Sequence, residues 1–295
     1  MWRGMQQRAS GMDEAALMDE FAISEPLILL GRGGSGTRLL SSMAQTSGVF
    51  LGNELNSTQD SVEWITDIYD LAFESTSSGI AAASSRDLYW RDRLRKRAAE
   101  ILAKASLSPD VLWGWKLPET MLALAQVLRT FPRARIVHLV RHPFGIAARR
   151  THLTSRSDNP VGRAVLAAAY RACGLDEKDI PFDPIYLHNA TTWNYQVASV
   201  LRVLRDAALP ERVLLLRYEE ICLRGDEAQR RFADFLGIVA PSMHAPSIDW
   251  SRIGEVAYER SIADRIWSVC GETASALGYN QDDAGIEAPR TPLAP

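Results

Sequence analysis

The distribution of apolar residues along the chain predicts short buried strands that alternate with amphipathic helices. Leu27–Leu30 is an uninterrupted apolar run, a glycine-rich segment follows it, and Thr37–Thr46 then has the spacing of a helix with one apolar face. Residues 49–51 read as a further short strand. The other expected strands are residues 111–115, Arg135–Val140 and residues 212–216.

Segments with apolar residues at intervals of three and four predict helices between these strands. The expected helices are Thr37–Thr46 and residues 61–73, 87–104, 119–129, 145–153, 192–208 and 228–236. Such alternation predicts the α/β class, with a mainly parallel sheet and helices on both of its faces. In sheets of this kind, ligands bind beyond the carboxyl ends of the strands.

Polar residues stand at the carboxyl end of each main predicted strand. The first strand is followed by the glycine-rich segment, the second by Lys116, the third by Arg141 and the fourth by residues 217–220 (Arg-Tyr-Glu-Glu). Parallel strands end at one edge of a sheet, so these groups are expected to lie together. Because three of the four strand ends carry a cation, the pattern predicts a shared site for an anion.

Composition limits the classes of function. The chain has 295 residues, 46% of them hydrophobic, which suits one large α/β domain or two small ones. The formal net charge of −3 argues against a nucleic-acid partner. Three cysteines have neither zinc-site spacing nor the even number of a disulfide framework, so we expect no metal and a reducing compartment. No segment has the roughly 20 apolar residues of a membrane span or the apolar core of a signal peptide, and we expect a cytoplasmic protein.

The expected organisation is one central domain between two polar ends. Residues 1–24 are mostly polar or small and are expected to form a loosely ordered extension. Residues 282–295 contain three prolines and few apolar residues, which is typical of a tail. The domain is therefore expected at residues 25–281.

The glycine-rich segment after the first strand has the composition of a phosphate-binding loop. Free N–H groups of such a loop and of the following helix N-terminus point at one anion, and glycine lets the main chain approach it closely. Gly31, Gly33 and Gly36 satisfy the dinucleotide fingerprint G-x-G-x-x-G, with Glu54 at the distance of a ribose ligand.

Two other loop types also fit this segment. Gly31 and Gly36 have the spacing of a Walker A loop, but Thr37 and Arg38 stand where that loop needs lysine followed by serine or threonine. Ser35-Gly36-Thr37 resembles the centre of a 5′-phosphosulfate loop. The segment by itself leaves a nicotinamide-dependent oxidoreductase, an ATP-binding enzyme and a phosphosulfate-binding enzyme open.

Taken in order, the motifs of the chain resemble those of sulfotransferases that use 3′-phosphoadenosine 5′-phosphosulfate (PAPS), of the bacterial and carbohydrate type. The resemblance spans about Pro26 to Glu259 and rests on the loop and on residues 113–118, 135–143, 217–220 and 252–254. It implies a P-loop-like three-layer sandwich. It also implies transfer of a sulfuryl group from PAPS to a hydroxyl or amine of a sugar or other small-molecule acceptor. The alternative within the family is an inactive nucleotide-binding relative.

The resemblance further implies which residues bind the donor. These residues are Ser35, Gly36, Thr37 and Arg38 for the 5′-phosphosulfate, Arg141, Arg252 and Gly254 for the 3′-phosphate, and Tyr218 near the adenine. Two positions depart from the family. Gly34 replaces a loop lysine, so Arg32 or Arg38 is expected to supply its charge. Arg149 replaces a serine of the 3′-phosphate site, and Arg149 or one of the two residues after it is expected to substitute.

The chemistry needs a positive charge at the oxygen that leaves with the nucleotide, and a base for the acceptor proton. Lys116 stands where cytosolic family members have a catalytic histidine. It is expected to stabilise the leaving group, because a lysine of ordinary pKa is a poor base at neutral pH. The resemblance implies Glu63 as the base, because it follows the loop at roughly the distance at which carbohydrate sulfotransferases keep a catalytic glutamate. Glu54 is the second choice, and His142 and His152 are further alternatives.

The remaining polar segments are assigned to the surface or to the acceptor. Residues 154–163 read as a mobile loop and a candidate substrate lid. The basic cluster in residues 91–97 reads as a solvated helix face. Most tryptophans and His138 read as core residues, and the sequence leaves open whether the protein is a homodimer.

Overall fold

Four parallel strands form the centre of the protein. The computed structural model describes residues 24–77, 85–107, 111–149, 152–239 and 258–282. The strands β1 (Leu27–Leu30), β2 (Gly114–Lys116), β3 (Arg135–Val140) and β4 (Val213–Arg217) are hydrogen-bonded in the order β2-β1-β3-β4. The expected α/β class with a parallel sheet is confirmed.

Helices and short 3-10 turns connect the strands. The helices are α2 (Thr37–Thr46), α3 (Ile65–Ser77), α4 (Ser85–Ala105), α5 (Thr120–Thr130), α6 (Pro143–Ala147), α7 (Pro160–Ala172), α8 (Ile185–Asp206), α9 (Tyr218–Leu223), α10 (Gly225–Leu236) and α11 (Arg260–Ala276). The 3-10 turns are η1 (Val62–Trp64), η2 (Leu153–Ser155), η3 (Glu177–Asp179) and η4 (Pro210–Arg212).

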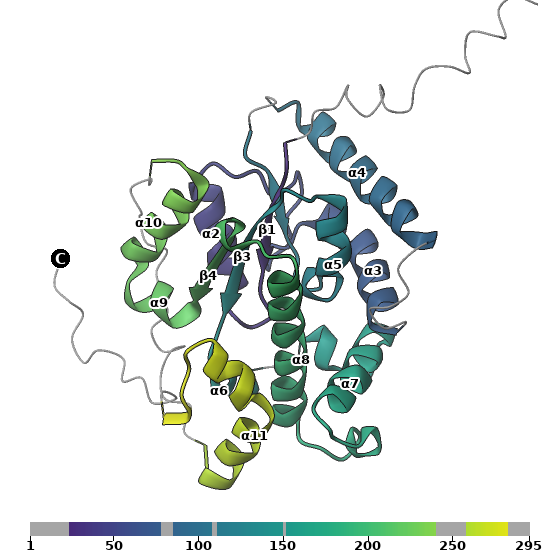
Figure 1. Ribbon diagram of the computed structural model, residues 1–295, viewed down its shortest axis with the longest axis vertical. Helices are drawn as coiled ribbons and strands as arrows, with labels where there is room; N and C mark the ends of the chain where they lie inside the picture. The colour runs from purple at the N-terminus through teal and green to yellow at the C-terminus, as the bar shows by residue number, and fades with distance from the viewer. Residues whose placement is uncertain (1–23, 78–84, 108–110, 150–151, 240–257, 283–295) are drawn as a thin grey trace, which may run out of the picture.

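The sheet is buried on both faces, which gives the molecule three layers (Figure 1). Leu27 and Leu29 of β1 pack in a cluster with residues of α2, α9 and α10. Ile28 and Leu30 pack in a second cluster with residues of α3, α4, α5 and α8. Successive side chains of a strand point to opposite faces, so a strand covered on both sides must be apolar at every position.

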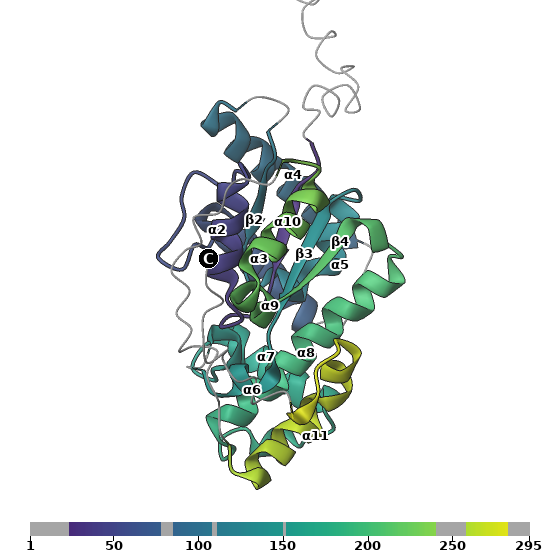
Figure 2. The same cartoon turned by 90° about the vertical axis from the view of Figure 1, so that its left-hand side faces the viewer.

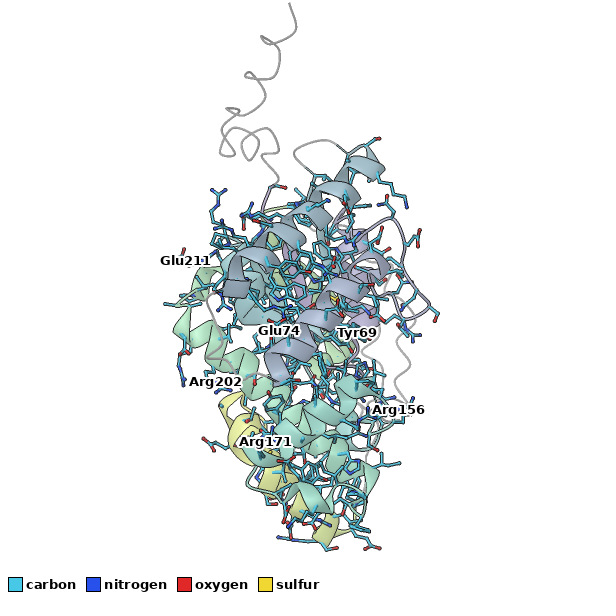
Figure 3. The ribbon with its side chains drawn as sticks, turned by 90° about the vertical axis from the view of Figure 1, so that its right-hand side faces the viewer. Tyr69, Glu74, Arg156, Arg171, Arg202 and Glu211 are labelled. Carbon is cyan, nitrogen blue, oxygen red and sulfur yellow. The ribbon has the colours of Figure 1, made fainter. Side chains whose placement is uncertain are left out.

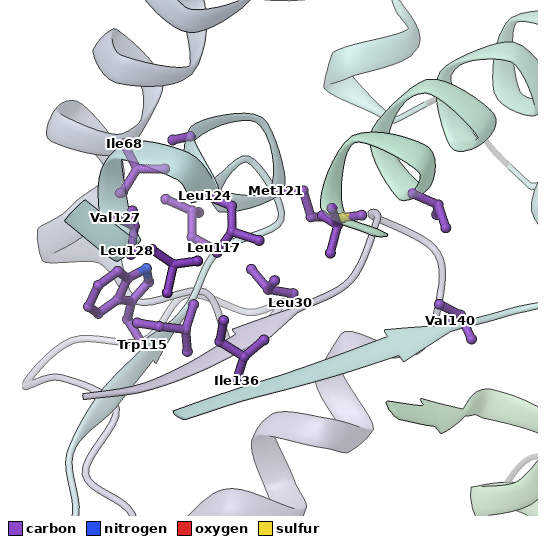
Figure 4. Packing of buried hydrophobic residues seen from close by; sticks show 14 of the residues in the cluster. Leu30, Ile68, Trp115, Leu117, Met121, Leu124, Val127, Leu128, Ile136 and Val140 are labelled. Carbon is purple, nitrogen blue, oxygen red and sulfur yellow. The ribbon is translucent and has the colours of Figure 1, made fainter. Parts of the chain in front are cut away.

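The second cluster is built around tryptophan. Trp115 of β2 stacks on Trp64 with their ring centroids 4.1 Å apart. Figure 4 shows Trp115 and Leu30 with residues of α3 and α5, among them Ile68 and Leu124. The expectation that most tryptophans are core residues is confirmed. His138 is likewise fully buried in β3, and burial lowers the pKa of its imidazole to about 4.

The parallel register brings the carboxyl ends of the strands to one edge. Leu29 of β1 is the partner of Lys116 in β2, and Val140 of β3 is the partner of Arg217 in β4. Strand β1 pairs with β2 on one side and with β3 on the other. The chain passes from β1 to β2 and then crosses to β3, so the strand order reverses at β1. Open α/β sheets bind ligands at such a reversal point. In Figures 1 and 2, α6, α7 and α11 lie together beyond one end of the sheet, and α6 begins three residues after β3 ends.

Two expectations for residues 145–163 are wrong, one of them only in part. The helix after β3 begins at Pro143 and ends at Ala147, because His142 caps it and a proline is well tolerated in the first turn. The expectation of a loop over residues 154–163 is wrong only in part, because residues 156–158 form an exposed turn. Thr154 and Ser155 are buried in η2, and α7 begins at Pro160 with the Asn159 side chain accepting a hydrogen bond from the Gly162 N–H. The Asn-Pro pair is a helix-start signal that the sequence interpretation missed.

Other elements differ in extent. Residues 49–51 form no strand, but Phe50 makes an isolated parallel bridge to Trp113. The strand expected at 111–115 is Gly114–Lys116, so Lys116 is its last residue rather than the residue after it. α7, α9 and α11 were not predicted, and α8 begins at Ile185 instead of residue 192.

The basic cluster of α4 is partly structural. Arg93 Nε and Arg97 Nε donate to the two carboxylate oxygens of Asp67 at 2.5 and 2.7 Å. The Asp67 side chain is 1% exposed, whereas each arginine side chain is about one-third exposed. The two arginines therefore neutralise a buried carboxylate of α3 and join α4 to it, so the interpretation of this cluster as a solvated face is wrong for these two residues.

Replacing Asp67 with asparagine is expected to lower the free energy of unfolding by about 2 kcal/mol, because two partly exposed guanidinium groups lose their shared counter-charge. Urea denaturation measures the change. Asp70→Asn is the matched control, since Asp70 also pairs with Arg93 but is 58% exposed. Equal losses in the two variants would contradict the buried-clamp interpretation.

Candidate functional site

A cavity of about 780 Å³ opens at the carboxyl edge of the sheet. Its walls come from the glycine-rich loop, the outer side of α2, residues 58–60, and the ends of β2, β3 and β4. Ligand sites of small-molecule enzymes have volumes of about 300–1,000 Å³. The cavity thus has the size of a ligand site and lies where the sheet topology predicts one.

The charge on the cavity wall is strongly positive. Arg38, Lys116, Arg141 and Arg149 line it, and Asp60 is the carboxylate among the described lining residues. The chain as a whole has a formal net charge of −3. The cavity wall is therefore positive although the chain as a whole is negative, which favours a multiply charged anion as ligand.

Two glycines of the loop have backbone conformations that other residues rarely adopt. Gly34 has φ 93° and Gly36, which caps α2, has φ 91°. A side chain at Gly34 would meet only ordinary contacts with Arg149, so the backbone angle and not space disfavours a lysine there. The first N–H groups of α2 have no partner within the helix, and they begin at this turn.

Two rings close on the loop from opposite sides. A Cβ added at Gly33 would lie 1.9 Å from His152 Cδ2, and one at Gly36 would lie 2.2 Å from Tyr218 Cδ2. The Arg141 guanidinium lies 4.2 Å from the centroid of the Tyr218 ring, and its Nη1 donates to the Gly34 carbonyl at 3.3 Å. Glycine at 33 and 36 is thus required by packing, and Tyr218 supports Arg141.

Of the two candidates for the missing loop lysine, Arg38 lines the cavity and Arg32 does not. Arg32 is 1% exposed and lies among uncharged acceptors: the Gly33 carbonyl and the side chains of Ser155, Asn189 and Thr192, at 2.6–3.2 Å. Burial lowers the pKa of its guanidinium to about 9, so it remains charged at neutral pH. Ser35 is also buried, with an Oγ that has no hydrogen-bond partner within the described part of the chain.

Lys116 and Asp60 form an ion pair on the wall. Lys116 Nζ donates to Asp60 Oδ1 and, at 2.7 Å, to the Thr58 carbonyl. Burial lowers the pKa of Lys116, and the Asp60 carboxylate opposes this shift. Burial by itself would raise the pKa of Asp60, but hydrogen bonds from Lys116, Thr58 and Asn56 bring it below its usual value. The Asp60 carboxylate is therefore ionised at neutral pH and forms an ion pair with Lys116.

The structure does not bring the expected bases Glu63 and Glu54 to the cavity wall. Glu63 Oε1 accepts a hydrogen bond from the Asn53 N–H at 2.8 Å. Glu54 is 62% exposed and lies 3.6 Å from Lys104 Nζ. His142 is buried, and its Nδ1 accepts from the Phe144 N–H at the start of α6.

Other expected site residues divide between the wall and the undescribed segments. Gly34, Gly36, Thr37, Arg149 and Tyr218 line the cavity. Arg252 and Gly254 lie outside the described residues, as do residues 150 and 151.

A comparison of the sequence with known families gives a match over most of the chain. The profile of the sulfotransferase family matches residues 26–241. The chain belongs to the sulfotransferase family. The oxidoreductase and ATP-binding interpretations of the loop are therefore set aside, and the protein is a sulfotransferase enzyme.

Solved structures of sulfotransferases share the fold. The sulfotransferase from Alicyclobacillus acidocaldarius has a TM-score of 0.52 and 13% identity, over 89% of this chain and 99% of that one. Sulfotransferase STF9 from Mycobacterium avium has a TM-score of 0.50 and 16% identity, over 89% and 80% of the two chains. The sulfotransferase domain from the curacin biosynthetic pathway has 18% identity and a TM-score of 0.48, over 87% and 98%. No curated protein matches the sequence significantly.

Among the described helices of this sulfotransferase, none is long and apolar enough to cross a membrane.

Two carboxyl groups of this sulfotransferase were missed from the sequence. Asp60 looks like an ordinary loop residue until Lys116 is placed beside it. Glu119 is 1% exposed, and its Oε1 lies 3.8 Å from His152 Nε2. Burial raises the pKa of Glu119 to about 7, helped by Asp60 and opposed by Tyr69 and Lys116. The short spacing between Lys116 and Glu119, at the end of a strand that reaches the ligand edge, was the signal available for it.

The Glu119→Gln variant is expected to gain stability relative to wild type as pH rises. A carboxyl whose pKa is raised from 4.5 to about 7 on folding stabilises the folded state below pH 4.5 and loses this contribution as pH rises through 7. The difference in free energy of unfolding between variant and wild type should therefore shift by about 3 kcal/mol between pH 4 and pH 8 in favour of the variant. Chemical denaturation at a series of pH values measures it, and a pH-independent difference would refute the shift.

Proposed function

We propose that this sulfotransferase transfers a sulfuryl group from PAPS to a hydroxyl or amine of a sugar or other small-molecule acceptor. The observation that carries the proposal is the cavity wall, which combines a phosphate-type loop with four cationic side chains and a single carboxylate among its described lining residues. A nucleotide with phosphate groups at both the 3′ and 5′ positions supplies the multiple negative charges that such a wall favours. The family assignment supports sulfuryl transfer as the reaction.

The donor is proposed to lie along the loop with its phosphates at two groups of cations. The 5′-phosphosulfate is assigned to the N-terminus of α2 and to Arg38, which lies in the first turn of that helix and lines the cavity. The 3′-phosphate is assigned to Arg141 and Arg149 on the far side of Gly34, because a guanidinium can bind a phosphate through two parallel hydrogen bonds. Arg252 and Gly254 remain a sequence-based prediction for the same phosphate.

The transfer itself is assigned to Lys116 and Asp60. The bond between sulfur and the bridging oxygen of the nucleotide breaks, and sulfur forms a bond to the acceptor oxygen or nitrogen. Lys116 stabilises the negative charge on the departing phosphate. Asp60 is ionised and lines the cavity, so it can accept the acceptor proton and pass it to solvent. We prefer Asp60 to Glu63 because its carboxylate reaches the cavity.

Arg141→Ala is expected to weaken binding of adenosine 3′,5′-bisphosphate at least 100-fold, because two charge-assisted hydrogen bonds to a phosphate are lost. Isothermal titration calorimetry of the purified protein measures the dissociation constant. Arg205→Ala is the control, since Arg205 is 77% exposed at the end of α8. If wild type gives no heat of binding, the donor assignment fails.

Lys116→Met and Asp60→Asn are expected to act on turnover instead of donor binding. Loss of the Lys116 charge should lower the transfer rate about 100- to 1,000-fold, and loss of the Asp60 base about 100-fold. Transfer of labelled sulfate from PAPS to a panel of sugars, phenols and amines measures the rate, and calorimetry measures bisphosphate affinity in the same samples. Asp60→Asn should bind the bisphosphate at least as tightly as wild type, because it removes a negative charge. A loss of affinity as large as that of Arg141→Ala in either variant would overturn the assignment.

A further inference from the structure

Glu119 is a buried carboxyl without an evident structural task. Both of its side-chain oxygens are buried, and neither has a hydrogen-bond partner at standard geometry among the described residues, although the Tyr69 hydroxyl is close enough to stabilise the carboxylate. Buried polar groups are almost always hydrogen-bonded, because an unpaired one keeps the full desolvation cost. Glu219 shows the usual arrangement: its Oε1 accepts from the His142 N–H and its Oε2 from the Tyr279 hydroxyl, both at 2.9 Å. Glu119 differs from Glu219 in this respect, and its neighbours Asp60, Lys116 and His152 line the cavity.

The titratable groups that face Glu119 come from four segments. They are Asp60 and Lys116 on the cavity wall, His152 at the start of η2, and Tyr69 on α3, which Figure 3 labels. Asp60 and Lys116 neutralise each other as an ion pair. Burial and the Arg32 charge lower the pKa of His152, and burial raises the pKa of Tyr69, so both are uncharged at neutral pH. Glu119 is thus the group of this set whose charge changes near pH 7.

The hydrogen bonds of His152 fix which ring nitrogen carries the proton. Nδ1 accepts from the Thr154 N–H at 3.4 Å and lies 3.0 Å from Thr154 Oγ1, which itself accepts from Gln196 Nε2 at 2.9 Å. Nδ1 is therefore the acceptor, and the neutral ring carries its proton on Nε2. This Nε2 lies 3.8 Å from Glu119 Oε1, and a Cβ on Gly33 would lie 2.3 Å from it. One N–H group thus stands between the carboxyl and the loop.

We propose that Glu119 is a positioning residue of the anion site, which acts on the loop through His152 and takes up a proton when an anionic donor binds. The inference rests on the proposed function, because it assumes that a phosphate or phosphosulfate occupies the loop. When Glu119 is ionised, its charge opposes that of the ligand and attracts the His152 Nε2–H. When Glu119 is protonated, both effects disappear and the Nε2–H is available to the ligand. The proton comes from solvent, and no covalent bond other than the carboxyl O–H is formed.

The coupling has a defined sign and limit. An anion on the loop raises the proton affinity of Glu119, so binding draws a proton from solvent and is tighter at pH 6 than at pH 8.5. Each unit by which the ligand raises the pKa of Glu119 corresponds to at most a tenfold change in affinity across this range. At pH 7.5 the uptake should be on the order of 0.3 to 0.5 proton per ligand. The ligand phosphates have second pKa values near 6 and are then almost fully ionised.

Calorimetry of adenosine 3′,5′-bisphosphate at pH 7.5, in two buffers of different ionisation enthalpy, measures the protons taken up. We expect uptake by wild type and its loss in Glu119→Gln. We also expect Glu119→Gln to bind several-fold more tightly than wild type at pH 8.5 and equally well at pH 6. The matched control is Glu272→Gln, which removes the same charge from an exposed position of α11 and should behave as wild type.

The outcomes separate this inference from the proposed function. Binding with equal proton uptake in wild type and Glu119→Gln would overturn the role of Glu119 and leave the donor assignment intact. Absence of binding to both proteins would overturn both. If Glu119→Gln does not fold, the calorimetry of wild type alone tests the coupling. Release of protons on binding at pH 7.5, or no proton exchange, would refute it. A purely structural Glu119 would alter the melting temperature of the variant without moving the proton count.

Discussion

The central strand β1 is the constraint from which the site follows. It is hydrogen-bonded on both edges and covered on both faces, so its four residues must all be apolar and its direction is fixed. Its end delivers the glycine loop to a point between β2 and β3. Lys116 at the end of β2 and Arg141 after β3 therefore lie beside the loop, because parallel strands end at the same edge of the sheet.

This arrangement places like charges close together, which is electrostatically unfavourable. Four cations on one wall and the buried Arg32 beneath the loop repel each other in a protein of net negative charge. The fold holds these charges with uncharged acceptors such as the Gly34 carbonyl and the Asn189 side chain, and with one carboxylate at Lys116. An anion at this wall would reduce the repulsion among these cations, which is why the charge pattern favours an anionic ligand.

The sequence was sufficient where the structure depends on short-range pattern. β1, α2 and β3 have the predicted bounds, because apolar runs and a glycine turn specify them locally. The burial of Thr154 and Ser155 was missed because it depends on partners far along the chain, Gln196 and Arg32. α7 was missed although its Asn-Pro start is a local signal.

The candidate site shows the same division between local pattern and distant contact. Strand ends identified Lys116 and Arg141, whose positions follow from the sheet. Asp60 becomes a candidate only because the fold brings it beside Lys116, which is 56 residues away along the chain and follows from no spacing rule. Glu119 had a local signal in its short distance from Lys116, but its burial beside His152 depends on the fold. Glu63 was the expected base because its distance from the loop resembled a family pattern, but the structure directs its carboxylate to the Asn53 N–H.

The two rings that lie on Gly33 and Gly36 have a consequence for the speed of binding. The His152 and Tyr218 rings pack against the loop and restrict its movement, and Gly34 and Gly36 already have the positive φ angles that the loop needs. A ligand therefore meets a surface whose shape exists beforehand, and little chain entropy is lost on contact. Association at this loop should be limited by diffusion and long-range attraction instead of by a slow rearrangement of the loop.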